Sequence, residues 1–276
     1  CFLVSDEIVV ITRSARSGSH SALEWRGRPD GTYTVKTLER DVAPGTRVYV
    51  RAKAGCEDYL KQARVEKLAL HFGSLLPIPI TLVNGQTRTV LNDVPPPWRA
   101  QHSSPADLHA DLMDYGRQAV QTPFFDAVPI HALGGSLQGV AYVLPFRPTL
   151  AAQGTHRVYL KGMLVSESAK NLVPEWAFFV KCLVDAQALR PNASREALYE
   201  DQALEQARTA LGRCLRRYLI DLSRKDAKKW RTFLALHTLS IKALALQDDE
   251  LYSLFIDWLP FETSLGEMTL AEVRER

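Results

Sequence analysis

The chain has 276 residues, 46% hydrophobic and 24% charged, and Lys plus Arg exceed Asp plus Glu by three (34 against 31). This composition is typical of a soluble globular protein with a sizeable core, and the length favours two domains. The charge excess is too small to indicate a nucleic-acid partner or a membrane surface.

None of the four cysteines forms a C-x-x-C pair, and they lie far apart, at Cys1, Cys56, Cys182 and Cys214. This spacing differs from that of a disulfide framework or a zinc site, and reduced thiols in the cytoplasm are the simpler interpretation. The sequence contains no signal peptide and no apolar run long enough for a membrane helix. Because Cys1 is followed at once by ordered-looking sequence, we expect an internal portion of a longer protein.

Strands are predicted for most of the first 50 residues, at 8–11, 23–25, 33–35 and 47–50. A Ser/Gly-rich loop covers 14–21, and Asp30-Gly31 indicates a hairpin turn. A helix is expected over 57–72, with four apolar positions buried, and then a strand over 77–83; the buried positions are Leu60, Val65, Leu68 and Phe72. The prolines at 95–97 favour a domain boundary between about residues 82 and 95.

Helices dominate the second half. Ser104 and Pro105 have the residue types of an N-cap and a first helical position, and Leu108, Leu112 and Tyr115 share a face. Strands are predicted over 140–144 and 157–165, and a helix is expected to begin at Pro174, with Ala177, Val180 and Val184 on its apolar side. Further helices are expected over 201–223, 226–244 and 248–258. The mixture predicts an α/β or α+β fold.

Possible metal, phosphate and nucleic-acid sites have simpler interpretations. His102 and His109 lack a completing ligand cluster, and His237 is interpreted as a core histidine. The run Gly134-Gly135-Ser136 lacks the full phosphate-loop pattern and is interpreted as a hairpin turn. A basic cluster is interpreted as a solvated helix face, because Asp221 and Asp226 interrupt it; its members are Arg213, Arg216, Arg217, Arg224, Lys225, Lys228, Lys229 and Arg231.

The segment 189–198 is a loop that enters a helix. Pro191 and Asn192 break the preceding structure, and Ser194 is a candidate cap for the next one. Arg195 then stands near a helix start, where backbone N–H groups favour anions and a guanidinium can bind phosphate. By itself this pattern favours an ordinary salt bridge.

Several short blocks, in shared order, resemble the heat-shock protein 90 family. The most specific covers 174–198: Pro174-Glu175-Trp176, Phe179-Val180-Lys181, Val184-Asp185 and then NASREAL resemble the family's PEYLNFVRGVVDS and LPLNxSRExL at the same spacing. Residues 158–165 are similar to its LYVRRVFI strand. Shorter likenesses lie at 2–6, 45–46, 97–98 and 264–267. The chain is thereby identified as a divergent bacterial member of the HtpG type.

The resemblance implies three segments. Residues 1–82 would end an ATP-binding domain with a partial two-layer sheet. Residues 84–200 would form the three-layer α/β/α part of a middle domain, and 201–276 a helical connector with a small α/β end. The family's catalytic glutamate and Mg²⁺ ligand would lie upstream of Cys1, so we expect this chain alone not to hydrolyse ATP, and the sheet over 1–50 to lack apolar cover.

The resemblance also implies the function, an ATP-dependent chaperone with ATPase activity, ATP and Mg²⁺ as cofactors, and a role in protein folding under stress. Thr46 would lie near the adenine and Val48 in the pocket wall. Arg195 would reach the terminal phosphate as the catalytic residue, and Asn192 would shape its loop. No metal ligand is expected within this chain.

The implied partners are unfolded client proteins, the upstream ATP-binding domain and a second copy, held through a C-terminal domain beyond this chain, all in the cytoplasm and without nucleic acid or membrane. The alternative is a module that binds clients or partners without hydrolysis, to which Arg195 would be irrelevant. Three departures from the family stand out: Tyr199 replaces its glutamine, Gly162 replaces an arginine, and 144–150 does not match its APFDLF loop.

Overall fold

The structure is a computed structural model that describes residues 2–16, 21–39, 41–147, 155–193 and 198–275. The chain divides into two compact units. The first unit comprises Cys1–Leu70 and Thr81–Thr89, and the second comprises His71–Ile80 and Val90–Arg276. The three predicted domain segments, 1–82, 84–200 and 201–276, remain predictions.

The first unit is built on an antiparallel four-stranded sheet of order β3-β2-β1-β4, with β1 Ile8–Arg13, β2 Ala22–Gly27, β3 Tyr33–Leu38 and β4 Gly45–Val50. The four predicted strands and the hairpin at Asp30-Gly31 are therefore confirmed. After the sheet come a short helix, α1 and a hairpin, with bounds η1 Glu57–Leu60, α1 Gln62–Gly73, β5 Thr81–Asn84 and β6 Thr87–Val90.

The two faces of this sheet differ. On one face Ile11 and Ala22 are buried together with Val42 from the loop before β4. On the other face one cross-strand row joins all four strands, in the order Val48, Val10, Trp25 and Val35. Val48 and Val35 at the ends of this row are exposed by 57% and 54%. This apolar row leaves an uncovered surface on the described part of the unit.

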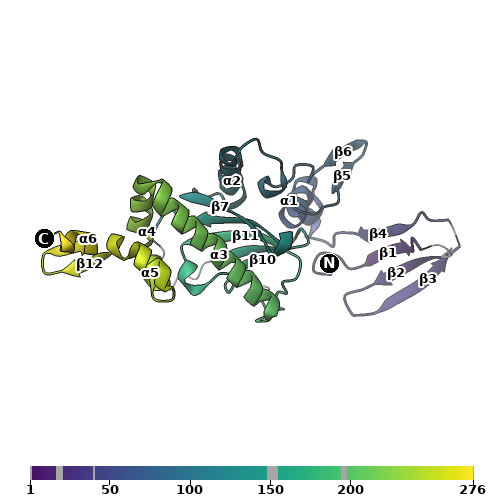
Figure 1. Ribbon diagram of the computed structural model, residues 1–276. Helices are drawn as coiled ribbons and strands as arrows, with labels where there is room; N and C mark the ends of the chain where they lie inside the picture. Colours follow the sequence, from purple (N-terminus) through teal and green to yellow (C-terminus); the bar gives the residue numbers. More distant parts are fainter. Residues whose placement is uncertain (1, 17–20, 40, 148–154, 194–197, 276) are drawn as a thin grey trace. The chain divides into compact units, whose positions relative to one another are not determined.

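The second unit holds a mixed five-stranded sheet of order β10-β9-β11-β8-β7, in which only β9 and β11 run parallel. Its strands are β7 Asp126–Ala132, β8 Leu137–Val143, β9 His156–Leu160, β10 Met163–Ala169 and β11 Val180–Ala186. Helix α2 (Pro105–Val120), preceded by η2 (Pro97–Arg99), covers one face through Leu112. Helices α3 (Gln202–Lys225) and α4 (Ala227–Ala245) cover the other, which gives the predicted three layers (Figure 1).

The C-terminal part is a run of capped helices and one hairpin. Asp201, Asp226 and Asp248 accept hydrogen bonds from backbone N–H groups at the starts of α3, α4 and α5. The elements after α4 are α5 Asp249–Phe255, η5 Ile256–Trp258, β12 Pro260–Thr263, β13 Gly266–Thr269 and α6 Leu270–Arg274. The predicted α/β fold and the helices at 104, 201 and 226 are confirmed.

The helix predicted from Pro174 is wrong. Only the single turn η4 (Glu175–Ala177) forms there, and Val180 and Val184 belong to the strand β11 instead. Six of the seven residues of β11 are buried between the helix layers. A strand covered on both faces is apolar on both, so its sequence lacks the alternation that identifies a strand.

Two further predictions need correction. The strand expected over 157–165 is the hairpin of β9 and β10, since Lys161 and Gly162 have φ of 51° and 86°. A Cβ at position 162 would lie 2.3 Å from the Leu75 carbonyl oxygen, so glycine is required there. The helix over 57–72 is interrupted at Lys61, which is extended, and Leu60 and Phe72 are exposed rather than buried.

Shorter differences occur elsewhere. The strand expected over 77–83 begins only at Thr81, in β5, and the last predicted helix shortens to α5 with the turn η5 behind it. The Gly134-Gly135 turn between β7 and β8 is confirmed. Three residues of the basic cluster form ion pairs: Arg216 contacts Asp248 and Glu250 at 2.8 and 2.5 Å, Lys225 contacts Asp221, and Lys229 contacts Asp126. Among the described residues, no helix has the length and hydropathy for crossing a membrane.

His237 is a buried core residue, as predicted. Its Nε2 lies 2.9 Å from the Leu144 carbonyl oxygen, and it stands at a non-helical point of α4 with φ of −124°. His156 is buried at the start of β9, where its Nδ1 accepts from the Cys182 N–H at 3.0 Å. Burial lowers the pKa of each imidazole to about 4, and for His156 the nearby Lys181 charge adds to the effect.

Replacing Phe233 by alanine should cost about 3–5 kcal/mol of unfolding free energy. This side chain is fully buried and its ring contacts those of Trp230 and Phe179. Urea unfolding followed by tryptophan fluorescence measures the loss. Leu239→Ala on the same helix is the control, because Leu239 is 54% exposed. Equal losses in the two variants would contradict the assigned core.

Acid should destabilise the second unit through His156 and His237. Each folded-state pKa lies near 4 against an ordinary 6.5, so the unfolded chain binds the extra protons. The stability from each neutral histidine is complete above pH 6.5 and is lost as the pH falls towards 4.

Each histidine should contribute a slope of about 1.4 kcal/mol per pH unit within that window. His156→Asn retains an acceptor for the Cys182 N–H, and His237→Gln retains a donor for Leu144. Each variant should lower the slope of unfolding free energy against pH by about 1.4 kcal/mol per pH unit within that window. An unchanged dependence in both variants would show that neither imidazole is held neutral.

Candidate functional site

The predicted adenine-side residues lie on one face of the first unit. Thr46 and Val48 are two positions apart on β4, so the strand alternation turns both side chains to the same side. Thr46 Oγ1 lies 2.9 Å from the hydroxyl of its cross-strand neighbour Thr12. Val48 belongs to the apolar row that also contains Val10 and Trp25.

This face combines the two properties that a nucleobase requires. The flat rings of a base need an apolar wall, and the base edge needs a hydrogen-bond partner. Val48 and Trp25 offer the first, and the hydroxyl pair of Thr12 and Thr46 offers the second. The residues present therefore fit an adenine placed against the face.

The second predicted set lies in a loop of the other unit, after β11. Pro191 and Leu198 pair as an isolated antiparallel bridge, and the Tyr199 N–H donates to the Arg190 carbonyl oxygen at 2.9 Å. These contacts close the base of the loop. Asn192 is half-buried just inside it, while Arg195 lies outside the described residues.

Helix α3 begins directly behind this loop. Asp201 accepts from the Leu204 N–H at 3.0 Å and also binds the Arg190 guanidinium at 2.8 Å. The helix-start N–H bond and then the Arg190 hydrogen bond lower the pKa of the Asp201 carboxyl. One carboxylate therefore links the strand side of the loop to the first turn of the helix.

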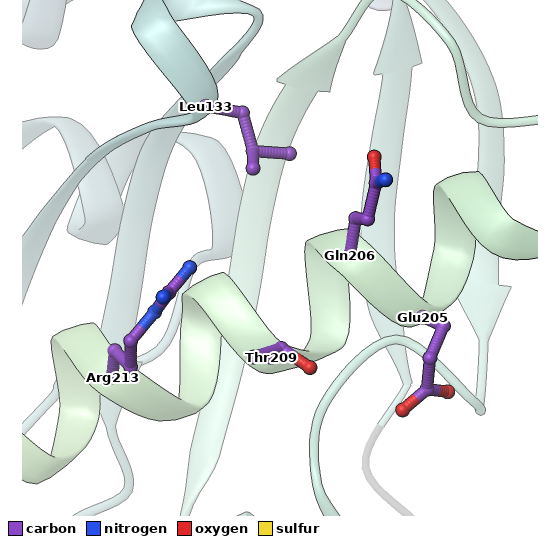
Figure 2. A pocket seen from close by; sticks show the side chains of 5 residues that line it. All are labelled: Leu133, Glu205, Gln206, Thr209 and Arg213. Carbon is purple, nitrogen blue, oxygen red and sulfur yellow. The ribbon is translucent and has the colours of Figure 1, made fainter.

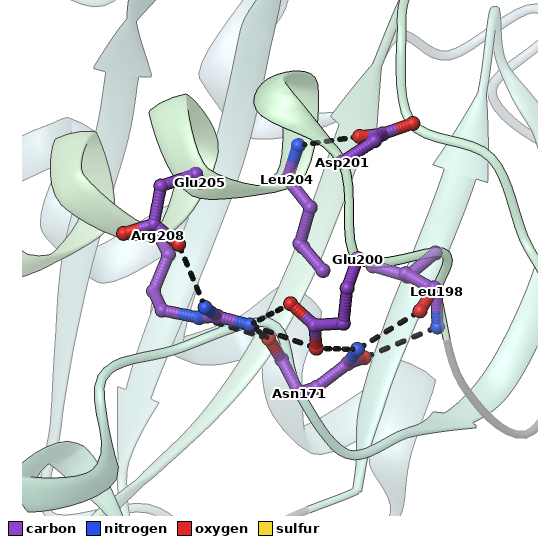
Figure 3. A network of polar contacts seen from close by, with 7 residues as sticks. All are labelled: Asn171, Leu198, Glu200, Asp201, Leu204, Glu205 and Arg208. Carbon is purple, nitrogen blue, oxygen red and sulfur yellow. Dashed lines mark hydrogen bonds and ion pairs between the residues drawn. The ribbon is translucent and has the colours of Figure 1, made fainter.

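A network that the sequence did not reveal surrounds the same loop base (Figure 3). Asn171 forms hydrogen bonds with both backbone groups of Leu198, and Arg208 and Glu200 complete the network. Arg208 Nη2 lies 2.9 Å from the Asn171 carbonyl oxygen, 37 residues away in sequence. No local pattern marks residues so far apart, and only the packing of α3 behind the loop brings them together.

Asp126 is a buried carboxylate that sequence analysis also missed. It contacts His109 of α2 at 2.5 Å, Tyr218 of α3 at 2.8 Å and Lys229 of α4 at 2.6 Å. Burial alone would raise its pKa, but the hydrogen bonds from Lys229, His109 and Tyr218 leave it lowered. Since all three helices of the two outer layers contribute a partner, this contact fixes the layers to the sheet.

A shallow pocket lies between the β7–β8 turn and α3 (Figure 2). Its lining residues are Leu133, Glu205, Gln206, Thr209 and Arg213. None of them belongs to a predicted site, and Glu205 is paired with Arg208 at 2.9 Å. The described residues contain no cluster of side chains suited to hold a metal ion.

Comparison with known proteins shows that the loop and the helices behind it are similar to one family. Residues 147–275 match the family model described as Hsp90 protein. Over these residues the chain is similar to Hsp90 proteins, and the identity to individual relatives is low. The Hsp90 match covers the whole loop base, α3 and α4, so the predicted resemblance is confirmed.

Similar proteins extend the Hsp90 relation over most of the chain. The chaperone protein HtpG of Oleidesulfovibrio alaskensis is 28% identical over 245 residues, which cover 86% of this chain and 37% of that protein. HtpG of Chlorobium phaeovibrioides is 26% identical over 287 residues, covering 99% and 44%. The mitochondrial heat shock protein 75 kDa of Rattus norvegicus is 25% identical over 238 residues, covering 84% and 33%. This chain spans about a third of the length of the curated relatives it matches first.

Proposed function

We propose that this chain is the central part of an ATP-driven chaperone, in which Thr46 and Val48 contact the adenine and Arg195 contacts the terminal phosphate. The observation that carries the proposal is the Hsp90-family match over 147–275, which includes the Asn192–Arg195 segment. The fit of the Thr46 face to a nucleobase supports the adenine side.

The chemistry of phosphoryl transfer explains the proposed role of Arg195. Negative charge spreads over the oxygens of the transferred group in the transition state, and a positioned guanidinium stabilises it. Mg²⁺, when bound, neutralises phosphate charge, and its ligands are proposed to lie in a segment upstream of this chain. Because the arginine comes from a different domain than the adenine contacts, hydrolysis depends on the docking of the two domains.

The remaining features of the proposal concern the whole protein. Its clients are unfolded proteins, which the middle domain helps to hold, and it dimerises through a C-terminal segment. We place it in the cytoplasm. A protein that only binds clients without hydrolysis is the second candidate, and the loss of Arg195 would leave such a protein unaffected.

Thr46→Val should weaken ATP binding by about tenfold, since it removes a hydroxyl that the base edge uses while keeping the shape. Thr37→Val is the control, because Thr37 lies on the same face but on the far edge strand. Calorimetric titration of the full-length protein with ATP gives both affinities. Equal ATP affinities in the two variants would show that Thr46 does not contact the adenine.

Arg195→Ala should lower kcat for ATP by about a hundredfold or more and change the ATP dissociation constant by no more than about twofold. Steady-state turnover of the full-length protein, together with the same titration, separates the two quantities. Arg213→Ala, an exposed arginine of α3 at the shallow pocket, should behave as wild type. Unchanged turnover in Arg195→Ala would show that Arg195 is not the catalytic arginine. The absence of ATP hydrolysis by the wild-type protein would favour the module that only binds clients.

A further inference from the structure

Three side chains from separate segments meet at the base of the loop between Pro191 and Leu198 (Figure 3). Asn171 lies just after β10, Glu200 lies just before α3, and Arg208 lies in the second turn of α3. None of the three was a predicted site residue.

Asn171 takes the place of a strand partner for Leu198. Its Nδ2 donates to the Leu198 carbonyl oxygen at 2.9 Å, and its Oδ1 accepts from the Leu198 N–H at 3.1 Å. Leu198 is only 3% exposed, and backbone groups at such a position need protein partners. The loop therefore re-enters the fold at a point fixed by one amide side chain.

Arg208 fixes Asn171 in turn. Its Nε and Nη2 donate to the Asn171 carbonyl oxygen at 3.3 and 2.9 Å, and Nη2 also binds the two Glu200 carboxylate oxygens at 3.2 and 3.0 Å. Glu200 closes the triangle by accepting from Asn171 Nδ2 at 2.6 Å. The planar, rigid guanidinium can hold these partners in one arrangement, which a lysine cannot.

The charge of Glu200 is consistent with its contacts to Asn171 and Arg208. The hydrogen bond from Asn171 and then that from Arg208 lower the pKa of the Glu200 carboxyl, which keeps it ionised. The carboxylate thus remains an acceptor for both neighbours at neutral pH.

We infer that Asn171, Glu200 and Arg208 form a clamp that positions the loop carrying Asn192 and Arg195 for its contact with phosphate. The inference rests on the proposed function. A catalytic group displaced by about 1 Å can lose a hundredfold in rate, so the anchor of such a loop acts on turnover through the arginine. The clamp residues are positioning residues and do not touch the substrate themselves.

A merely structural role would have a different signature. If the network only stabilised the start of α3, its loss would lower stability and leave the turnover of the folded protein unchanged. Asp201 already holds that helix start by its own hydrogen bond to the Leu204 N–H. Kinetic measurements on folded protein therefore separate positioning from stability.

The test is a double-mutant cycle in the full-length protein with Asn171→Ala, Arg195→Ala and both together. Asn171→Ala should lower kcat about tenfold and leave the ATP dissociation constant within about twofold. In the Arg195→Ala background the same change should have no further effect, since the two act through one contact. Additive losses, or unchanged turnover in Asn171→Ala, would overturn the inference.

Glu205→Gln is the matched control, because Glu205 pairs with the same guanidinium through Nη1, at 2.9 Å, whereas Asn171 and Glu200 are held by Nη2. It should keep wild-type turnover. If Asn171→Ala does not fold, Glu200→Ala replaces it in the cycle, since the Glu200 side chain is 64% exposed. Glu200→Ala should lower kcat less than Asn171→Ala does, and it too should have no further effect in the Arg195→Ala background.

Amide hydrogen exchange distinguishes failure of the clamp from failure of the proposed function. If Arg195→Ala leaves turnover unchanged, the proposed function fails and the catalytic part of the inference fails with it. Exchange at the Leu198 and Tyr199 amides still tests the anchor: faster exchange in Asn171→Ala but not in Glu205→Gln supports it. Equal exchange in these two variants overturns it.

Discussion

The burial of β11 on both faces is the constraint on which the second unit depends. Cys182 and Val184 point into the core beneath α3 and α4, while Leu183 between them packs on the α2 side. The strand also pairs with β8 on one side and β9 on the other, so it has no free edge. Asp185 near its end binds Arg99 and the Gly162 N–H, which attaches the β9–β10 hairpin to the sheet. After β11 the chain runs on to the Pro191–Leu198 bridge, which closes the base of the loop proposed for phosphate contact.

The burial of β11 on both faces also explains why the sequence predicted the other elements better than this strand. Helices α3 and α4 were predictable because Asp201 and Asp226 provide caps and the apolar residues recur at helical spacing. The strands of the first unit were predictable for the opposite reason, because they alternate or are β-branched between clear turns. β11 was not, since a strand apolar on both faces has the same composition as a buried helix. The hairpin at Gly162 was missed because its need for glycine comes from the Leu75 backbone, 87 positions earlier in the chain.

The sequence likewise indicated some residues of the candidate site and not others. Thr46 and Val48 were named only through the family resemblance, and the structure shows that they lie on the same side of β4. The role of Arg195 came from the family resemblance, because an arginine near a helix start has ordinary uses in most proteins. Asn171, Glu200 and Arg208 could not be found from one sequence, since the contacts of Asn171 that hold them together join residues 27 to 37 positions apart. Long-range polar contacts depend on packing that is settled only when the helix layer is in place.

Asp126 carries a consequence for how this protein can change over generations. Its carboxylate is shared by His109, Tyr218 and Lys229, from three different helices. Losing any one donor leaves a buried charge short of a partner, while replacing the whole set by apolar residues of similar volume need not cost stability. These four positions should therefore be inherited as a block: across lineages they are kept together or replaced together, and intermediates with three of the four are the ones that selection removes.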